Sequence, residues 1–196
     1  MVWTGLIVLA VGPVLLIAAS PWLAGRGVVY VSAGIAGAAA LSVLLIQPLL
    51  ASGWLPGLSP GRARRLHRAL GSLLVGAVVL HVGGLYLTSP PDALDALLLL
   101  SPTPFSVWGV LAMWATILTA LLVAARRRLR LSPQVWATLH NALALIVVAG
   151  SVIHALLIRG LMEPVSKTIL CIAVLAATGA VVLHLRVVRP LRRRTG

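Results

Sequence analysis

The chain has 196 residues, of which 60% are hydrophobic and only 10% are charged. A soluble domain of this length needs a far more polar surface, so the composition excludes a soluble globular protein. The formal net charge is +13, but the arginines stand in short clusters between apolar runs, without the interleaved aromatic residues of a nucleic-acid-binding surface. The chain is therefore predicted to be an integral membrane protein without a soluble domain, in contact with lipid and not with nucleic acid.

Six apolar runs, taken in chain order, are each long enough to cross a bilayer as a helix. The first run has no positively charged start and no cleavage site after it, so it is interpreted as a retained helix rather than a signal peptide. Ser132 and Pro133 are typical of a helix N-cap and the first helical residue after it. The predicted fold class is all-α, a six-transmembrane helix bundle with helices at about 2–24, 28–50, 65–88, 105–125, 134–158 and 166–188.

Positive charge lies mainly on one side of this arrangement. Thirteen arginines fall in the connection after residue 50, in the connection after residue 125 and in the C-terminal segment. The opposite side carries only three basic residues and all of the acidic ones, which are Arg26, Arg159, Lys167, Asp92, Asp95 and Glu163. The positive-inside rule then places both termini in the cytoplasm. We expect a multi-pass protein of a cell membrane, such as a bacterial inner membrane.

Four of the five histidines form two pairs with equal spacing. His67 and His81 are fourteen residues apart in the third predicted helix, and His140 and His154 are fourteen residues apart in the fifth. Fourteen residues make close to four helical turns, so each pair lies on one helix face, with its members about 21 Å apart. The two helices run in the same direction, which predicts two layers. His67 and His140 form an inner pair near the cytoplasm, and His81 and His154 form an outer pair.

Imidazoles in two layers across a membrane favour a particular chemistry. Two imidazoles can hold a haem iron from both sides and leave no open coordination position, which is typical of electron transfer. A single intramembrane histidine is more often a polar residue that hydrogen-bonds between helices. Zinc binding and proton relay also use histidine, but no carboxylate occurs in any predicted span. The repeated spacing on two helices favours two haems over these alternatives.

The two histidines of the inner pair are not level in the predicted helices. His67 stands near the start of the 65–88 helix and His140 stands well inside its own helix, so a tilt or an earlier start must bring them level.

The motifs around these histidines resemble a known family, the ferric reductase-like transmembrane domain. They are RRLHRALG (64–71), which leads to His81, and WATLH (136–140), which leads to His154. The family includes ferric reductases, the membrane half of NADPH oxidases, and the haem-binding subunit of the bacterial periplasmic methionine-sulfoxide reductase system. The resemblance covers most of residues 1–196, which are interpreted as a single domain of this type. It implies two haem b groups, one held by His67 and His140 and the other by His81 and His154.

Two departures from the family bear on the electron donor. The haem subunit of the methionine-sulfoxide reductase system has no counterpart of His67, so the complete set of four histidines is more similar to the ferric reductases and NADPH oxidases. Those enzymes carry a flavin and nicotinamide domain after the last helix, and this sequence ends at RPLRRRTG without a G-x-G-x-x-G element. FAD or FMN is therefore expected only through a partner, and the chain alone is not expected to oxidise NADPH.

Other residues are candidates for a supporting role. Arg64 and Arg68 flank His67 and offer the bidentate donors that suit haem propionates, although arginines at a membrane boundary also serve simply as anchors. His184 could substitute as an inner ligand, but it has no spaced partner on its own helix, so an interfacial or packing role is favoured. Three tryptophans could contact a cofactor or pack in the membrane, namely Trp108, Trp114 and Trp136. The 89–104 connection is expected to lie in the interface and to cover the outer haem.

The sequence thus predicts a haem-binding membrane protein, without catalytic residues of its own, that carries electrons across the bilayer. The donor is a cytoplasmic flavoprotein or a quinol, and the acceptor lies outside. One alternative is a quinol-fed haem anchor for an extracytoplasmic reductase. A second alternative is a membrane scaffold or transporter without redox activity, whose histidines only bridge helices.

Overall fold

The computed structural model describes residues 1–185, and every regular element in that part of the chain is helical. The elements are α1 (Val2–Leu15), α2 (Val28–Ser52), α3 (Pro60–Thr88), α4 (Pro90–Leu97), α5 (Ser106–Leu129), α6 (Pro133–Leu157) and α7 (Pro164–Leu183), with short 3-10 helices at Leu16–Ala19 and Pro21–Leu23. Six helical segments are long and apolar enough to span a membrane, namely all of these except α4, with α1 extended to Ala19. The predicted six-helix membrane bundle is confirmed.

The histidine-bearing helices begin in the same way. Ser59 and Ser132 each accept a hydrogen bond from a backbone N–H three residues later, at 3.4 and 3.3 Å, and a proline follows each serine. Such a cap satisfies one of the free N–H groups at a helix start, and proline suits the first helical position. The third helix therefore begins at residue 60 rather than at the predicted 65. His67 and His140 each lie seven residues after the first residue of their helices, so they stand level without any special tilt.

Other predicted boundaries also differ, and α5 ends at Leu129 rather than at the predicted 125. The predicted helix over 2–24 is α-helical only to Leu15 and continues as 3-10 turns, which end where Ser20 adopts an extended conformation. The last predicted helix begins at Pro164, and residues 186–188 of its predicted range lie outside the described residues, as do the C-terminal arginines. The 89–104 connection contains α4, a helix with a polar and an apolar face.

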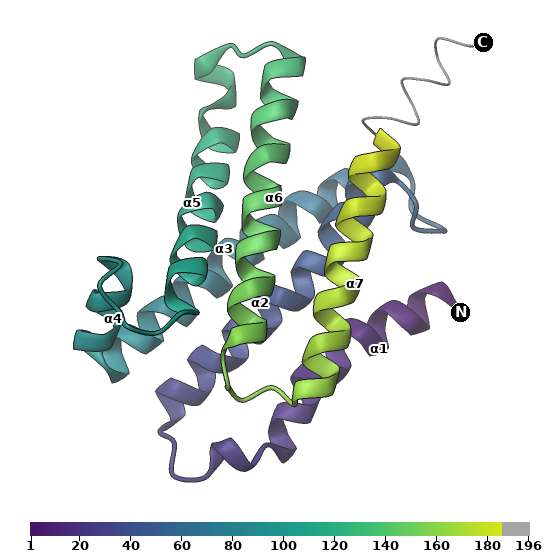
Figure 1. Cartoon of the computed structure of the whole chain (residues 1–196). Coiled ribbons are helices and arrows are strands. Elements are labelled where there is room, and N and C mark those ends of the chain that lie inside the picture. The colour runs from purple at the N-terminus through teal and green to yellow at the C-terminus, as the bar shows by residue number, and fades with distance from the viewer. Residues whose placement is uncertain (186–196) are drawn as a thin grey trace.

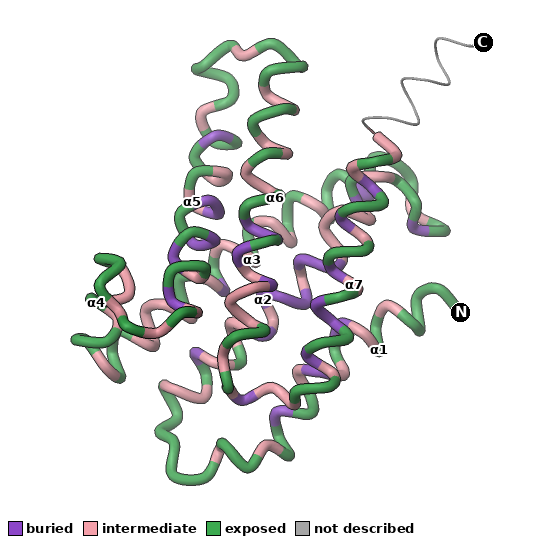
Figure 2. The backbone as a smooth tube through the Cα atoms, in the orientation of Figure 1, coloured by how far each residue is buried: buried purple, intermediate pink, exposed green. Residues whose placement is uncertain are grey.

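Two antiparallel hairpins make up the centre of the molecule. α2 packs along α3, and α5 packs along α6, while α7 and α1 cover α2 on one side (Figure 1). The best-buried side chains come from α7 and meet α2 and α6, and Leu170, Cys171 and Val174 are completely buried. Buried positions gather at this centre, and the outer helix faces are exposed (Figure 2). Those exposed faces are apolar, as Leu118 and Leu121 on α5 illustrate, and such faces suit contact with lipid.

The start of α7 is held by a carboxylate cap. Glu163 accepts hydrogen bonds from the backbone N–H groups of Ser166 at 2.6 Å and Val165 at 2.8 Å. These bonds, that from Ser166 first, hold the pKa of the Glu163 carboxyl below its usual range. The backbone N–H of Lys167 donates to the carbonyl of Glu163 at 3.0 Å, which fixes the first turn of α7 and with it the position of Lys167.

Candidate functional site: two facing pairs of histidines

The structure brings the four predicted histidines together as the two expected pairs. The ring centroids of His67 and His140 are 6.2 Å apart, with 66° between the ring planes. Those of His81 and His154 are 6.3 Å apart, with 79° between the planes. Each pair joins α3 to α6. The inner pair lies toward the end of the bundle that carries the arginine-rich connections, and the outer pair lies toward α4 and the α6–α7 connection.

Backbone carbonyls fix the rings of the outer pair. Nδ1 of His81 is 2.8 Å from the carbonyl oxygen of Ala33 on α2, and Nδ1 of His154 is 2.9 Å from that of Phe105. A carbonyl oxygen can only accept, so Nδ1 must carry the proton in both rings. The lone pair of each neutral ring is then on Nε2. Metal-binding histidines are commonly oriented in this way, with the ring nitrogen that does not bind the metal donating to a carbonyl or carboxylate oxygen.

A glycine makes room for each histidine ring of the outer pair. Gly37 lies four residues after Ala33, and Gly109 lies four residues after Phe105, so in both hairpins the glycine is one turn beyond the carbonyl acceptor. A Cβ atom on Gly37 would stand 2.7 Å from Nδ1 of His81, and one on Gly109 would stand 2.7 Å from Nδ1 of His154. The two outer histidines therefore occupy equivalent niches, each built by the helix that precedes their own.

The inner pair is held differently on its two sides. His67 and Gln47 are linked twice, because Nδ1 of His67 is 3.2 Å from the Gln47 carbonyl oxygen and the Gln47 side-chain amide donates to the His67 carbonyl at 3.2 Å. His140 instead stacks on Trp136, with centroids 5.0 Å apart and 9° between the planes. Nδ1 of His140 and Nε1 of Trp136 are both buried and have no hydrogen-bond partner within the described residues. The guanidinium of Arg126 also lies over the ring of Trp136, 4.3 Å from its centroid.

A cavity of about 860 Å³ surrounds the outer pair. Its volume falls in the range of roughly 300–1,000 Å³ that is usual for ligand and cofactor sites. Side chains of α2, α3, α5 and α6 form its apolar walls, and α4 lies along one side. Arg26 and Lys167 supply positive charge to the lining, and Asp92 and Asp95 of α4 supply negative charge. The 89–104 connection thus borders the outer histidines.

The separation of the rings suits a single metal ion between them. An imidazole nitrogen binds a metal at about 2.0 Å, so two rings that face one ion from opposite sides have centroids ~6.3 Å apart. Both observed separations match this value. Among residues 1–185, no group of three or more histidine, cysteine or acidic side chains could enclose a metal ion. The protein therefore offers two ligands per site, which fits a metal that brings its other ligands with it, as a porphyrin does.

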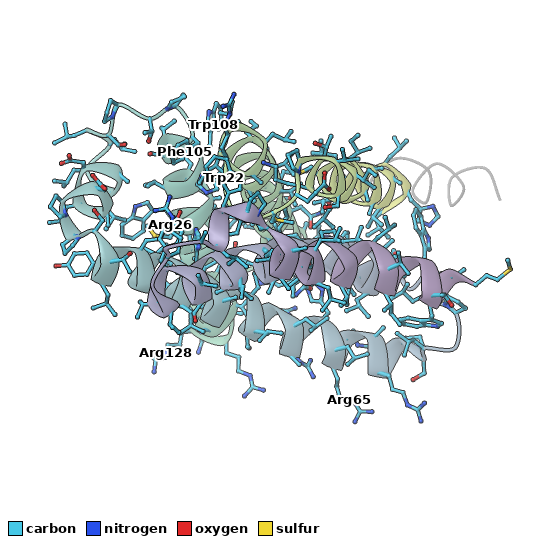
Figure 3. The ribbon with its side chains drawn as sticks, turned by 90° about the horizontal axis from the view of Figure 1, so that it is seen from below. Trp22, Arg26, Arg65, Phe105, Trp108 and Arg128 are labelled. Atoms are coloured by element: carbon cyan, nitrogen blue, oxygen red, sulfur yellow. The ribbon has the colours of Figure 1, made fainter. Side chains whose placement is uncertain are left out.

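The remaining predicted residues lie around the inner pair or at the boundaries. Arg64 and Arg68 are both exposed on α3; Arg64 is almost one turn before His67, and Arg68 follows it directly on a neighbouring face. The arginines at this end extend away from the bundle, as Arg65 and Arg128 show in Figure 3. His184 contacts Trp54 edge to face, with centroids 5.2 Å apart. Trp108 and Trp114 are exposed on α5, so of the three tryptophans considered, only Trp136 contacts a histidine of the two pairs.

The fold and these pairs define the class of protein, a six-helix membrane protein with histidines facing each other in two layers. The model of the family described as ferric reductase like transmembrane component matches residues 33–151, a stretch that includes α3, α5 and most of α2 and α6. The chain belongs to this family, and it is a multi-pass membrane component of electron transfer. No curated protein and no solved structure matches the chain.

Several residues of the site were not found by sequence reasoning. Gly37 and Gly109 carry no chemistry, and only their similar sequence separations from the outer histidines, 44 residues from Gly37 to His81 and 45 from Gly109 to His154, hint at their role. Lys167, which lines the cavity, is the chain's only lysine and stands in an apolar run. The repeated start S-P-x5-L-H, seen as SPGRARRLH and SPQVWATLH, is readable in the sequence and predicts that the two helices begin at equivalent places.

Proposed function

We propose that the chain binds two haem b groups and carries electrons across the bilayer, with His67 and His140 as ligands of an inner haem and His81 and His154 as ligands of an outer haem. The observation that carries the proposal is the matching separation of the rings in both pairs, 6.2 and 6.3 Å. A bound haem would supply a one-electron carrier at each level. The polypeptide supplies the ligands, fixes their tautomer and excludes water with its apolar walls.

The histidines act as neutral ligands with prescribed directions. In three of them the Nδ1–H group donates to a backbone carbonyl, which leaves Nε2 for the metal. Two histidines at each level would leave a bound haem iron no open position for a substrate, and such a site favours electron transfer. The members of a pair on one helix are fourteen residues apart, about 21 Å along the axis, so the two levels lie toward opposite sides of the bilayer.

Orientation, donor and acceptor complete the proposal. By the positive-inside rule the arginine-rich end lies in the cytoplasm, so electrons enter at the inner pair from a separate flavoprotein or a quinol and leave at the outer pair toward an extracytoplasmic acceptor. Any flavin would be bound by that partner. Arg64 and Arg68 are proposed to contact the carboxylates of the inner haem. A bacterial inner membrane, with an extracytoplasmic reductase as acceptor, would suit this direction.

Electron transfer across vesicles tests the function. The purified protein is placed in lipid vesicles that contain trapped ferricyanide, and dithionite is added outside. We expect the trapped ferricyanide to be reduced well above the rate in protein-free vesicles, and His81→Ala to lower the rate to that background. His184→Ala, which alters a histidine outside both pairs, is the matched control and should retain the rate. Equal rates for the wild type and His81→Ala would contradict the proposal.

The two alternatives are recognised by different results. A scaffold or transporter without redox activity would give no haem signal in a reduced-minus-oxidised spectrum. A quinol-fed anchor subunit would show both haems; reduction of these haems by a quinol and not by a flavoprotein would select this alternative among the donors that the proposal allows.

A further inference from the structure

Lys167 is a buried cation beside the outer histidines. Lys167 is 8% exposed, although it lies near the start of α7, where its side chain could instead extend to solvent. It lines the same cavity as His81 and His154. Burial of a positive charge is costly unless a partner compensates it, and an ionisable residue within a membrane span commonly marks a functional site.

The protein supplies only part of that compensation. Nζ of Lys167 donates one hydrogen bond, at 2.8 Å, to the carbonyl oxygen of Ile158. In the stretch from residue 1 to residue 185 no carboxylate pairs with it. An ammonium group has three N–H donors, so Nζ retains donors and an uncompensated charge next to the cavity.

The bond to Ile158 places the ammonium at the end of α6, just beyond His154. Ile158 is the extended residue that follows α6, and its backbone N–H donates to the His154 carbonyl at 3.1 Å. A haem held by His81 and His154 would occupy this cavity, and the Lys167 ammonium lines the same cavity on the side of the α6–α7 connection.

We propose that Lys167 binds a carboxylate of the outer haem and compensates its charge. This inference rests on the proposed function, because it requires a haem at the outer pair. The carboxylate restores the partner that the buried ammonium lacks, and charge-assisted bonds of this kind are the stronger ones. Arg159 is the cation nearest to His154 in the sequence, but it is exposed and is not among the residues that line the cavity.

The test is a redox titration of the purified full chain, in which the two haems are followed separately. Lys167→Met keeps an unbranched side chain of similar length and removes the charge. An uncompensated carboxylate favours the ferric state, so we expect the midpoint potential of one haem to fall and that of the other to stay unchanged. Lys167→Arg should restore the potential toward the wild-type value. Arg159→Met, which removes an exposed cation at the same end of the bundle, is the matched control and should change neither potential.

Replacement of the natural haem by its dimethyl ester separates a haem carboxylate from any other anion. With the ester bound, Lys167→Met and the wild type should have equal outer potentials; a persistent difference would overturn the inference. Loss of the outer haem in Lys167→Met with retention in Lys167→Arg would support it, because the charge and not the shape is then required. Loss in both variants would assign Lys167 to the packing of α6 against α7 and overturn it. Two haems with unchanged potentials in Lys167→Met would overturn the inference alone, whereas a wild-type protein without haem would overturn the proposed function as well.

Discussion

Two glycines determine whether the outer histidine rings fit. Gly37→Ala and Gly109→Ala would each place a Cβ atom 2.7 Å from a ring nitrogen, a distance that requires the ring to move. In a helix, alanine is otherwise more favourable than glycine by roughly 0.5–1 kcal/mol. We therefore expect each variant to fold and to fall from two haems toward one haem per chain, measured on the purified protein. Gly76→Ala is the control, since nothing lies within 4 Å of its Cβ position. Full haem content in Gly37→Ala would argue against the proposed niche.

Trp136 is expected to orient the ring of His140 in place of a hydrogen-bond acceptor. Nδ1 of His140 has no carbonyl partner, and the ring stacks on Trp136 instead. Aromatic pairs contribute about 0.5–1.5 kcal/mol, so Trp136→Leu should speed the loss of the inner haem about two- to tenfold. The measurement is haem transfer to an excess of apomyoglobin. Trp114→Leu, at an exposed tryptophan of α5, should leave the rate as it is; an equal effect of both substitutions would refute the specific role of Trp136.

At the scale of the element, the contact between α2 and α3 carries the outer site. A Cβ atom on Gly84 would stand 2.7 Å from Cβ of Ala33, the residue whose carbonyl accepts from His81. Gly84→Val should push the helices apart, and overpacking of this kind costs about 1–3 kcal/mol. We expect a lower thermal midpoint in detergent, with early loss of the outer haem signal. Gly83→Val is a close control, because a Cβ atom on Gly83, one position earlier in α3, would have no atom of another residue within 4 Å. Identical midpoints for the two variants would contradict this account of the contact.

The sequence predicted the existence of the six helices better than the residues at which they begin. Apolar length and the paired histidines were sufficient for six spans and for the correct pairing of rings, because hydrophobic length and helical periodicity are local properties. The start of α3 is predicted too late, because GRARR (61–65) has the composition of a charged connection. In the structure Ser59 caps the helix and Pro60 is its first residue, so GRARR is helical. The niche of Gly37 and the burial of Lys167 depend on contacts between distant helices, and a single sequence does not encode those contacts in any local pattern.

At the scale of the whole molecule, the arrangement of charge should decide orientation. The arginine-rich connections after α2 and after α5 lie at one end, and α4 and the α6–α7 connection lie at the other (Figure 1). A fluorescent reporter that matures only in the cytoplasm should therefore be active when it is fused after Gly196. A secreted phosphatase inserted in the 89–104 connection should be active only on the outside. Activity of the phosphatase at Gly196 would reverse the assignment of the inner and outer pairs.

The central claim is that each pair of histidines holds one haem, and the most direct measurement is the number of haems per chain. The purified protein is assayed by pyridine haemochrome against its protein concentration, and its electron paramagnetic resonance spectrum is recorded in the oxidised state. We predict two b-type haems per chain, both low-spin, and one haem after His81→Ala combined with His154→Ala. A wild-type protein with no haem, or a double variant that keeps two, would contradict the claim.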